Sequence, residues 1–414
     1  MQSMIHDIKL APEGHKKINW VKEYMPVLRS LDKELSKTKP LLGKKMVVTI
    51  HLEAKTAYLA QILKNAGAEV AITGSNPLST QDDIAAALVE SGINVFATHN
   101  CSNAEYDEYL HRALDIKPDL IIDDGGDLVH LLHNERADLA KNIIGGSEET
   151  TTGVHRLKAL DSQNKLTFPM IAVNDAYCKY LFDNRYGTGQ SSLEAIMHST
   201  NLVIAGKNVV VAGYGWCGKG VAMRAKGLGA NVIVTEINPI KAVEAMFDGF
   251  QVMTMEQAAP LGDIFITVTG CCDVINKTHY ALMKNGAILS NAGHFDLEVN
   301  VIDLRNLSVQ PPYEARKHIT AYTMSDGRKI NLIGEGRLVN LAAGDGHPSE
   351  IMDLSFAMQI LSMLYLLENK NKLGNNVHIL PEELNTKVAA LKLSSCNISI
   401  DKLTPEQIAY LQQA

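Results

Sequence analysis

The segment 207–220, KNVVVAGYGWCGKG, limits the possible folds of this chain more than any other feature of its sequence. An apolar, β-branched run leads directly into Gly213, Gly215 and Gly218, which have the G-x-G-x-x-G spacing. One glycine permits the tight turn, one lets a pyrophosphate approach the backbone, and one lets the next helix pack against the strand. These features predict a Rossmann-type domain that binds a dinucleotide.

The acidic residue Glu236 ends the next predicted strand, where a carboxylate accepts hydrogen bonds from both ribose hydroxyls. The same carboxylate would repel a 2′-phosphate, which favours NAD over NADP. A glycine pattern alone is often only a tight turn. Here strand, glycines, helix, second strand and acid follow one another in order, and we therefore expect an NAD site.

Short apolar runs alternate with amphipathic stretches along the chain, which is typical of a parallel α/β fold. The first series of predicted strands covers 46–50, 69–73, 94–97, 120–123 and 169–173. The second series covers 207–211, 231–235, 263–267 and 287–290. A long apolar helix over about 350–367 should pack back on the first domain. We expect an α/β protein with two doubly wound parallel-sheet domains.

The composition excludes several classes of partner. The net charge of −7 argues against binding to nucleic-acid phosphates. The start of the chain lacks the pattern of a signal peptide, and we expect no apolar stretch long enough to span a bilayer. The six cysteines include no CxxC pair, and no Cys or carboxylate completes a ligand set around His130 and His133. We therefore expect a cytoplasmic protein without a catalytic metal.

Six polar strings lie outside the glycine-rich turn: NPLSTQDD (76–83), DDGGD (123–127), SEETTTG (147–153), VNDAYCKYLFDNRYGTGQS (173–191), NAGHFD (291–296) and EGRLVNLAAGDGHP (335–348). Together, in this order, they resemble the S-adenosylhomocysteine hydrolase family over nearly the whole chain. The resemblance implies a substrate domain split into 1–186 and 347–380, with the NAD domain, 187–346, inserted between the two parts. It also implies a C-terminal oligomerisation segment, 381–414, and a homotetramer.

The resemblance implies a small nucleoside thioether as substrate and one NAD per subunit. In this family the 3′-hydroxyl of the nucleoside is oxidised, which acidifies the hydrogen on C4′. Loss of that proton lets the thiol leave from C5′; water then adds and the hydride returns. The protein has to supply acids and bases in a site closed to water.

Position by position, the resemblance implies a catalytic set that comprises His51, Asp124, Glu149, Asn174, Lys179 and Asp183. Lys179 and Asp183 would handle the proton of the 3′-hydroxyl, Asp124 would take the C4′ proton, and His51 would exchange protons near C5′. The i,i+4 spacing of Lys179 and Asp183 is by itself that of an ordinary helix ion pair. Similarly, an ordinary turn is the alternative explanation of the DDGGD string, and a buried position in the core is the alternative explanation of His51.

For the cofactor, the resemblance adds Thr150, Thr151, Thr152, Asn184, Thr269, Gly293 and Asn340 to the glycines and Glu236. For the substrate, it implies Glu53, Lys55, Thr56, Gln81, His294, His347, Met352 and Phe356. Among these, His294 and its neighbour Phe295 would form a gate over the homocysteine channel.

The string HLEAKT (51–56) departs from most of the family, because Glu53 and Lys55 replace a small hydroxyl residue and an acceptor for the adenine amino group. Lys55 would suit the C6 carbonyl of hypoxanthine, and Glu53 its N1 hydrogen; such buried partners discriminate by about 10⁴. An S-inosylhomocysteine hydrolase or a dual-specificity enzyme is therefore an alternative to adenosine specificity. In the other interpretation, Glu53 and Lys55 pair with each other.

Two more departures concern the cofactor. Thr188 stands where many members have a cysteine near the nicotinamide, and a hydroxyl can replace that polar contact. The chain ends in TPEQIAYLQQA, without the Lys- and Tyr-containing tail that in longer family members reaches a neighbouring subunit's NAD, and this departure predicts weaker NAD retention. A 2-hydroxy acid dehydrogenase would have no use for Lys179, Asp183 or SEETTTG, and a catalytically silent homologue should lack some of the catalytic set.

Overall fold

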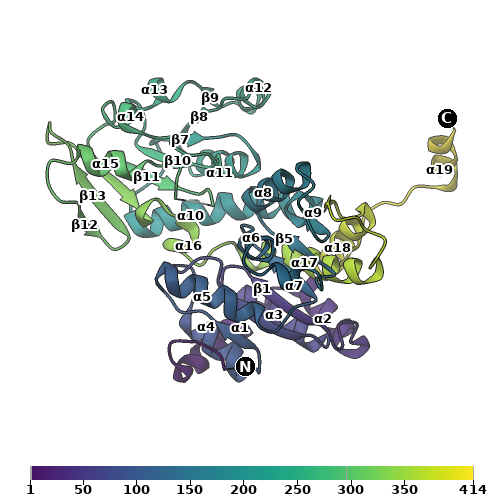
Figure 1. The fold of residues 1–414 in the computed structure, drawn as a ribbon. Helices are drawn as coiled ribbons and strands as arrows, with labels where there is room; N and C mark the ends of the chain where they lie inside the picture. The colour runs from purple at the N-terminus through teal and green to yellow at the C-terminus, as the bar shows by residue number, and fades with distance from the viewer. Residues whose placement is uncertain (1, 295, 414) are drawn as a thin grey trace.

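The computed structural model of the chain describes residues 2–294 and 296–413. Its first sheet is built from seven parallel strands: β1 (Lys45–Thr49), β2 (Glu69–Thr73), β3 (Asn94–Phe96), β4 (Leu120–Asp123), β5 (Gly145–Glu148), β6 (Met170–Ala172) and β15 (Val377–His378). They lie in the order β15-β6-β5-β4-β1-β2-β3 (Figure 1). Strand β15 follows the second domain in the sequence but belongs to the sheet of the first domain, so the second domain is inserted within the first.

The second sheet has the order β12-β13-β14-β11-β10-β7-β8-β9. Its strands are β7 (Asn208–Ala212), β8 (Asn231–Thr235), β9 (Gln251–Val252), β10 (Ile264–Thr267), β11 (Ala287–Asn291), β12 (Tyr313–Arg316), β13 (Ile319–Thr323) and β14 (Lys329–Ile333). Strands β12 and β13 form an antiparallel extension that the sequence did not predict. The predicted class, two doubly wound α/β domains with the second inserted in the first, is confirmed.

Successive side chains along the strands of the first sheet point to opposite faces, and each face is covered by a layer of helices. Met46 and Val48 face a core formed with α1 (Ala11–Glu23), α2 (Pro26–Thr38), α3 (Ala54–Asn65) and α4 (Asp82–Glu90). Val47 faces the opposite core, which is covered by α5 (Asn103–Leu114), α6 (Asp127–His133), α7 (Ala137–Ala140) and α8 (Thr151–Ser162). Because both faces of the sheet are buried, the middle of strands β1, β2 and β4 is apolar on both faces, as in other parallel sheets.

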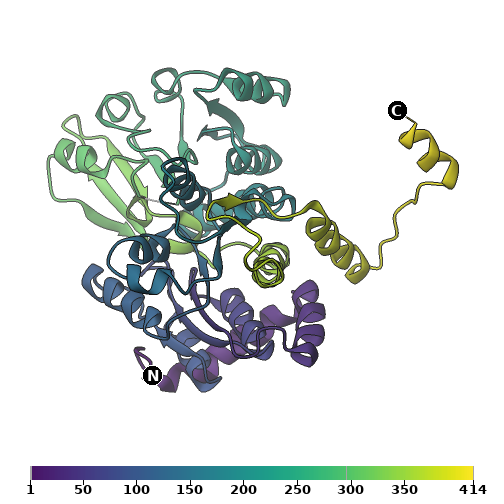
Figure 2. The ribbon, with the colours of Figure 1, turned by 45° about the vertical axis from the view of Figure 1, so that its right-hand side comes forward.

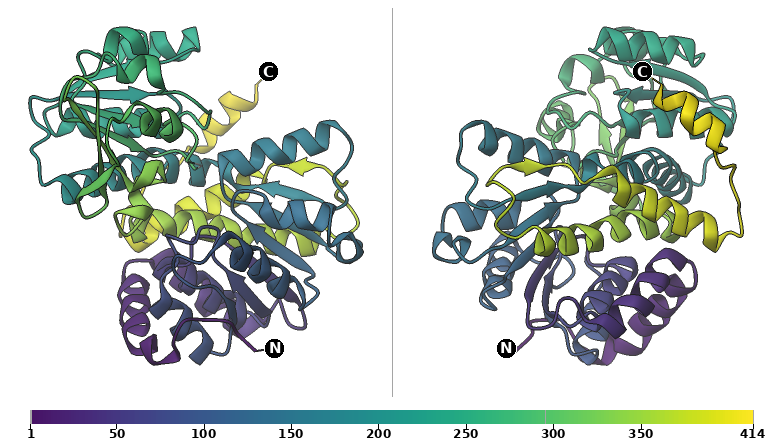
Figure 3. Two further views of the ribbon diagram at one scale, coloured as in Figure 1. Left: turned by 60° about the vertical axis from the view of Figure 1, so that its left-hand side comes forward. Right: turned by 90° about the vertical axis from the view of Figure 1, so that its right-hand side faces the viewer.

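The helix α17 (Ser349–Glu368) follows the second domain and packs on α2, α3, β5 and α18 (Glu382–Ser395), as predicted. Our expectation of no membrane-length segment was wrong by length and composition, since α17 is long and apolar enough to cross a bilayer. However, 72% of its most apolar window is buried inside the protein, which is the environment of a core helix. Figure 3 shows this helix crossing the middle of the molecule.

The chain passes between the domains twice. It leaves the first domain through η2 (Val173–Asp175), α9 (Tyr177–Tyr180) and the π-helix η3 (Asp183–Gly187), and enters α10 (Thr188–Thr200). It returns through α16 (Val339–Ala342) and the loop 343–348. Helix α11 (Trp216–Gly227) packs closely on both η3 and α10: a Cβ on Gly220 would lie 1.7 Å from the Arg185 carbonyl oxygen, and a Cβ on Gly189 would lie 2.5 Å from the Gly220 carbonyl oxygen. These two connections bring residues of both domains to one cleft.

The remaining helices of the second domain are α12 (Pro239–Phe247), α13 (Met255–Ala258), α14 (Lys277–Tyr280) and α15 (Val301–Leu307). Beyond α18, the chain extends to α19 (Pro405–Gln412), which stands away from both domains (Figure 2). Ile400, Tyr410 and Leu411 of this arm are each more than two-thirds exposed.

Candidate active site

Both sheets change strand order at one point, and these points face the same cleft. In the first sheet, β1 lies between β2 and β4, so the chain segments after β1 and β4 diverge. In the second sheet, β7 lies between β8 and β10 in the same way. Ligands of open α/β sheets bind at such switch points, beyond the carboxyl ends of the strands. His51 and Asp124 follow β1 and β4, and Gly213 follows β7.

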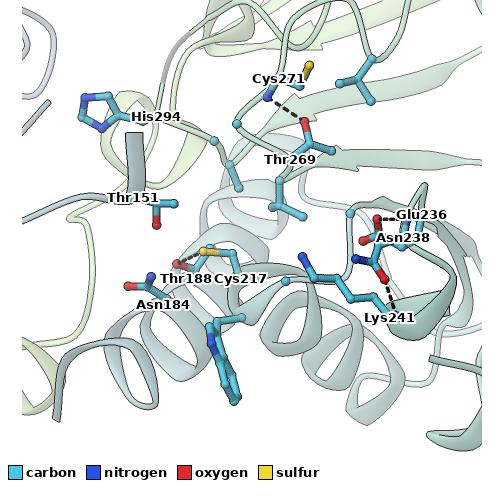
Figure 4. A pocket seen from close by; sticks show the side chains of 18 of the residues that line it. Thr151, Asn184, Thr188, Cys217, Glu236, Asn238, Lys241, Thr269, Cys271 and His294 are labelled. Atoms are coloured by element: carbon cyan, nitrogen blue, oxygen red, sulfur yellow. Dashed lines mark hydrogen bonds between the residues drawn. The ribbon is translucent and has the colours of Figure 1, made fainter. Parts of the chain in front are cut away.

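A cavity of about 1380 Å³ lies between the domains. From the predicted set it is lined by Thr150, Thr151, Thr152, Asn174, Lys179, Asp183, Asn184, Gly213, Gly215, Glu236, Thr269, Gly293, His294 and His347. Figure 4 shows His294 and Glu236 at opposite ends, with Asn184, Thr188 and Cys217 between them. Most of the predicted cofactor residues and three of the six predicted catalytic residues therefore share this cavity, whereas His51, Asp124, Glu149, Gly218 and Asn340 do not line it.

The glycine-rich turn has the geometry that a pyrophosphate requires. Gly213 has φ +104°, a conformation that favours glycine. A Cβ on Gly218 would lie 2.0 Å from the Gly213 carbonyl oxygen, so this glycine lets α11 pack against β7. At Gly215, by contrast, a Cβ would meet no atom within 4 Å, and the open space lies at the start of α11, where the helix dipole favours an anion.

Glu236 lies at the far end of the cavity. Its Oε2 accepts a hydrogen bond from Tyr214 N at 2.7 Å, and its Oε1 accepts from Ile237 N at 2.8 Å and Asn238 N at 2.9 Å. These bonds fix the carboxylate beside the turn, where the ribose of a bound dinucleotide would lie. The residues present therefore fit an adenosine ribose without a 2′-phosphate.

Asn340 provides a second test of the cofactor site. Its side chain is 1% exposed and donates to Ser191 Oγ at 3.0 Å, but its Oδ1 has no hydrogen-bond partner among the described residues. A buried acceptor without a donor is costly, so it indicates a missing partner. The amide of a nicotinamide carries the donor that this oxygen needs.

Lys179 is the centre of the charged network at the catalytic end. Its Nζ donates to Asn184 Oδ1 at 2.8 Å and lies 3.3 Å from Asp183 and 3.5 Å from Glu149. Burial disfavours the ammonium form, yet the two carboxylates outweigh this effect and raise the pKa of Lys179 above its usual value. Asn184 in turn donates to Asn174 at 3.0 Å.

Asp183 is held on three sides. His347 Nδ1 hydrogen-bonds one of its oxygens, Ser355 Oγ donates to the other at 2.7 Å, and Lys179 lies beside it. Burial alone would raise the pKa of this carboxyl, but Lys179 and His347 keep it far below its usual range. Asp183 is therefore a fixed anion that orients both Lys179 and His347.

Glu149 is buried and accepts a hydrogen bond from Gln359 Nε2, whose Oε1 accepts from Ser147 Oγ. Burial raises the pKa of Glu149 to about 8, and Lys179 limits this rise. A carboxyl with such a pKa exchanges a proton near neutral pH, which is what acid–base catalysis requires.

His51 and Asp124 form a second group next to the first. His51 Nδ1 hydrogen-bonds Ser79 Oγ at 2.6 Å, and His51 Nε2 lies 3.5 Å from Asp124 Oδ2. Burial lowers the pKa of His51 to about 4, although Asp124 opposes the shift, so the imidazole is neutral near pH 7. The ring centroid of His294 lies 6.1 Å away and covers Gly125, where a Cβ would meet the His294 ring at 2.9 Å.

Glu53 and Lys55 start α3 beside this group. Glu53 is the N-cap: its carboxylate accepts from Lys55 N and Thr56 N at 3.0 and 3.3 Å. Lys55 Nζ lies 2.8 Å from Glu53 Oε2 and donates to the Asp345 carbonyl at 2.9 Å. The two charges are thus paired with each other.

Several predicted substrate residues do not line the cavity. Phe356 is completely buried in the first core, and Met352 is 8% exposed there. Gln81 accepts a hydrogen bond from Lys17 at 2.9 Å and lines a separate cavity. Phe295 lies outside the described residues. The roles assigned to these residues stay predictions.

Four contributors escaped the sequence analysis. Ser355 and Gln359 interrupt the apolar sequence of α17 at i,i+4, and this spacing was the available signal of a polar face. Trp216 lines the cavity, and its ring lies 5.0 Å from that of Tyr180, which belongs to the other domain. No local pattern indicates that last contact.

Comparisons with known proteins agree with this geometry. The sequence model described as S-adenosyl-L-homocysteine hydrolase matches residues 2–141, and that described as its NAD-binding domain matches 184–346. An adenosylhomocysteinase of Thermococcus kodakarensis is 55% identical over 99% of this chain and 97% of its own length. An S-inosyl-L-homocysteine hydrolase of Methanococcus maripaludis is 56% identical over 99% and 98%, and an adenosylhomocysteinase of Thermotoga maritima is 56% identical over 96% and 98%.

Proposed function

Because the chain belongs to the S-adenosyl-L-homocysteine hydrolase family, we propose that its interdomain cavity hydrolyses S-adenosyl-L-homocysteine reversibly to homocysteine and adenosine. The enzyme is a thioether hydrolase with an NAD-binding domain. When bound at the glycine-rich turn, Glu236 and Asn340, NAD would supply the hydride acceptor for oxidation of the 3′ carbon and the hydride donor for its re-reduction. The other steps depend on the protein's own side chains.

Lys179 and Asp183 are proposed to hold the 3′-hydroxyl, and its proton is proposed to pass to the neighbouring Glu149 in its ionised form. The ammonium lowers the cost of the developing alkoxide, and Asp183, fixed by Ser355 and His347, keeps the ammonium in place. The neighbouring Glu149 can pass the proton on, since its pKa is about 8.

Asp124 and His51 are proposed to act at C4′ and C5′. Asp124 would remove the C4′ proton, which is acidic only while C3′ is oxidised. His51 is neutral, lies 3.5 Å from Asp124 and is hydrogen-bonded to Ser79, so it can exchange a proton with the leaving thiol or with water. His294 lies over this group and would help to exclude water.

One observation at the residues expected to contact the purine favours adenosine as the substrate. Glu53 and Lys55 pair with each other, and Lys55 also donates to the Asp345 carbonyl. Groups that satisfy each other are not available to a base. Hydrolysis of S-inosyl-L-homocysteine is the second candidate, because relatives with that name are as similar to this chain as the adenosylhomocysteinases.

The observation that carries the proposal is that Lys179 and Asp183 line the cavity that also holds the glycine-rich turn, with Glu149 buried 3.5 Å behind Lys179. The test is release of free thiol by the NAD-loaded protein, with the adenosyl and inosyl substrates offered separately. We expect thiol release and a higher kcat/KM for the adenosyl substrate. No thiol release from either substrate would reject the function.

A cytoplasmic homotetramer is also proposed. The arm from 396 to 413 presents Ile400, Tyr410 and Leu411 to solvent, and such apolar surface is typical of a contact between subunits. Removing the arm should lower the mass measured by light scattering. An unchanged mass would reject this role for the arm.

A further inference from the structure

Two buried carboxyl groups lie beneath the catalytic loops and have no part in the chemistry described above. Asp123 is the last residue of β4 and Glu148 the last residue of β5. The two residues are direct partners in the parallel register, and both side chains are 0% exposed. The catalytic candidates Asp124 and Glu149 are the next residues along the chain.

The two carboxyl groups accept four hydrogen bonds from the backbone of these loops and of the first turn of α6. Asp123 accepts from Asp124 N at 3.0 Å and from Val129 N at 3.0 Å. Glu148 accepts from Gly125 N at 2.9 Å and from Thr150 N at 3.0 Å. Glu148 therefore ties the loop that carries Asp124 to the loop that carries Glu149.

The two oxygens of Glu148 differ. Both backbone bonds go to Oε1, whereas Oε2 is buried and accepts no hydrogen bond among the described residues. Oε2 is thus buried without any hydrogen-bond partner in the part of the chain that the structure describes, and an ionised carboxylate would be costly in this position, which favours the uncharged acid. Gly153 lets α8 approach the acid closely, since a Cβ there would lie 2.1 Å from Glu148 Cδ.

The charges around Asp123 and Glu148 also favour an uncharged Glu148. Burial, and after it the charges of Asp123 and Asp124, raise the pKa of Glu148 well above its usual value. Burial, and then Asp127, raise the pKa of Asp123 to about 8. An uncharged acid avoids the large cost of a buried, unpaired charge.

We propose that Asp123 and Glu148 are positioning residues, which hold the loops of Asp124 and Glu149 in register while Glu148 is uncharged. The proposal rests on the function given above, since those loops carry its acids and bases. A displacement of about 1 Å at a catalytic group can lower the rate about 10²-fold. Two strand ends fixed to each other prevent such a displacement.

The proposal has two parts, the positioning role of Glu148 and its uncharged state, and the variants Glu148→Gln and Glu148→Leu test them separately. Glutamine keeps the Oε1 acceptor and mimics the neutral acid, so we expect kcat within about 3-fold of the native enzyme. Leucine leaves Gly125 N and Thr150 N without an acceptor, so we expect kcat to fall about 10²-fold with little change in KM. A glutamine variant as slow as the leucine variant would show that charge is needed, and a fully active leucine variant would show that no positioning occurs.

Asp353→Asn is the matched control. Asp353 is also 0% exposed and accepts from two backbone groups, Val27 N and Leu28 N, but it caps α2 away from the catalytic loops. We expect a lower Tm with unchanged kcat. If kcat of this variant fell as far as that of Glu148→Leu, the loss would be a general effect of disturbing a buried carboxyl, and the proposal would be overturned.

A pH profile of the glutamine variant tests the uncharged state without relying on the leucine variant's stability. Asp124 and Asp127 face the pair from the β4–α6 turn, with Tyr106 from α5 and Arg156 from α8. All of these are present in both enzymes, so the ratio of their kcat values should stay constant from about pH 6 to about pH 8. A ratio that changes tenfold would show that Glu148 titrates in this range.

If the native enzyme releases no thiol from either substrate, the proposed function fails first. The positioning role then fails if Glu148→Gln lowers the Tm as much as Glu148→Leu does.

Discussion

Lys55 Nζ lies 2.8 Å from Glu53 Oε2, and each of these side chains is only 7% exposed. A buried ion pair is costly to break, because removing one partner leaves an uncompensated charge worth about 3–5 kcal/mol. The pair therefore stabilises the start of α3 whether or not a purine is bound. A base that used Lys55 and Glu53 as its partners would first have to separate them.

The first prediction concerns the double variant Glu53→Gln/Lys55→Met, which removes both charges together and keeps a capping oxygen. If the pair is structural, kcat/KM should change by a similar factor for the adenosyl and inosyl substrates, so their ratio should stay within about 3-fold of native. Thiol release with each substrate gives the ratio. A shift of more than about tenfold toward the adenosyl substrate would mean that Lys55 binds the base and that the native enzyme prefers hypoxanthine.

The second prediction concerns Lys179→Met. Loss of the ammonium removes the cation that stabilises the developing 3′-alkoxide and leaves Asp183 and Glu149 side by side, so kcat should fall about 10³-fold. Lys158→Met is the control, because Lys158 forms an exposed ion pair with Asp175 at 2.8 Å and should be dispensable. Stopped-flow absorbance of reduced nicotinamide follows the 3′ oxidation directly. Normal reduction of the cofactor in the Lys179 variant would remove this residue from that step.

The sequence indicated features that depend on neighbouring residues and missed those that depend on the tertiary fold. The glycine-rich turn was visible because its strand, turn and helix are contiguous. The bond from Ser355 to Asp183 joins residues 172 positions apart, and that from Gln359 to Glu149 joins residues 210 apart. Only the packing of α17 under the cavity brings these groups together.

Strand β5, GGSE, could not be predicted from the sequence for a different reason. Two glycines and two polar residues do not resemble a strand, and none was predicted there. Its position in the sheet requires this composition: a Cβ on Gly146 would lie 2.5 Å from Ile121, and Glu148 has to reach the neighbouring loop. Here the needs of the site override β propensity.

The third prediction uses Gly215→Ala. The added methyl would meet no protein atom within 4 Å, so the variant should fold with an unchanged Tm in the absence of NAD. The methyl would occupy the space that the pyrophosphate needs, so the Kd for NAD should rise at least about tenfold. Gly227→Ala, at the other end of α11 and also without a neighbour within 4 Å, should leave both properties unchanged. Calorimetric titration with NAD checks both variants, and native affinity in Gly215→Ala would place the pyrophosphate elsewhere.

The fourth prediction concerns stability and pH. The pKa of His51 is about 4 in the folded protein, below the unfolded value of about 6.5, so the unfolded chain binds the extra proton between these pH values. Stability should therefore fall as the pH falls through this window, by up to about 3 kcal/mol from this residue. His51→Asn should reduce that loss, whereas replacement of His130, which is exposed on α6, should not. Urea unfolding at several pH values measures the slope. Equal slopes in the native protein and His51→Asn would contradict the buried neutral imidazole.

The last prediction turns Trp216 into a reporter of the cofactor. The chain has two tryptophans, and Trp20 lies on α1, 62% exposed, with its ring tilted against that of Tyr24. Trp216 lies at the start of α11, lines the cavity and contacts Tyr180 of the other domain. In a Trp20→Phe background, NAD should therefore change the emission of Trp216 with the same Kd that calorimetry gives. Adding Gly215→Ala should shift that titration to higher NAD concentration, because the aromatic ring and the glycine flank the same space. If the emission of Trp216 does not respond while NAD binds, the ring does not adjoin the cofactor, and the contact with Tyr180 serves only to hold the two domains together.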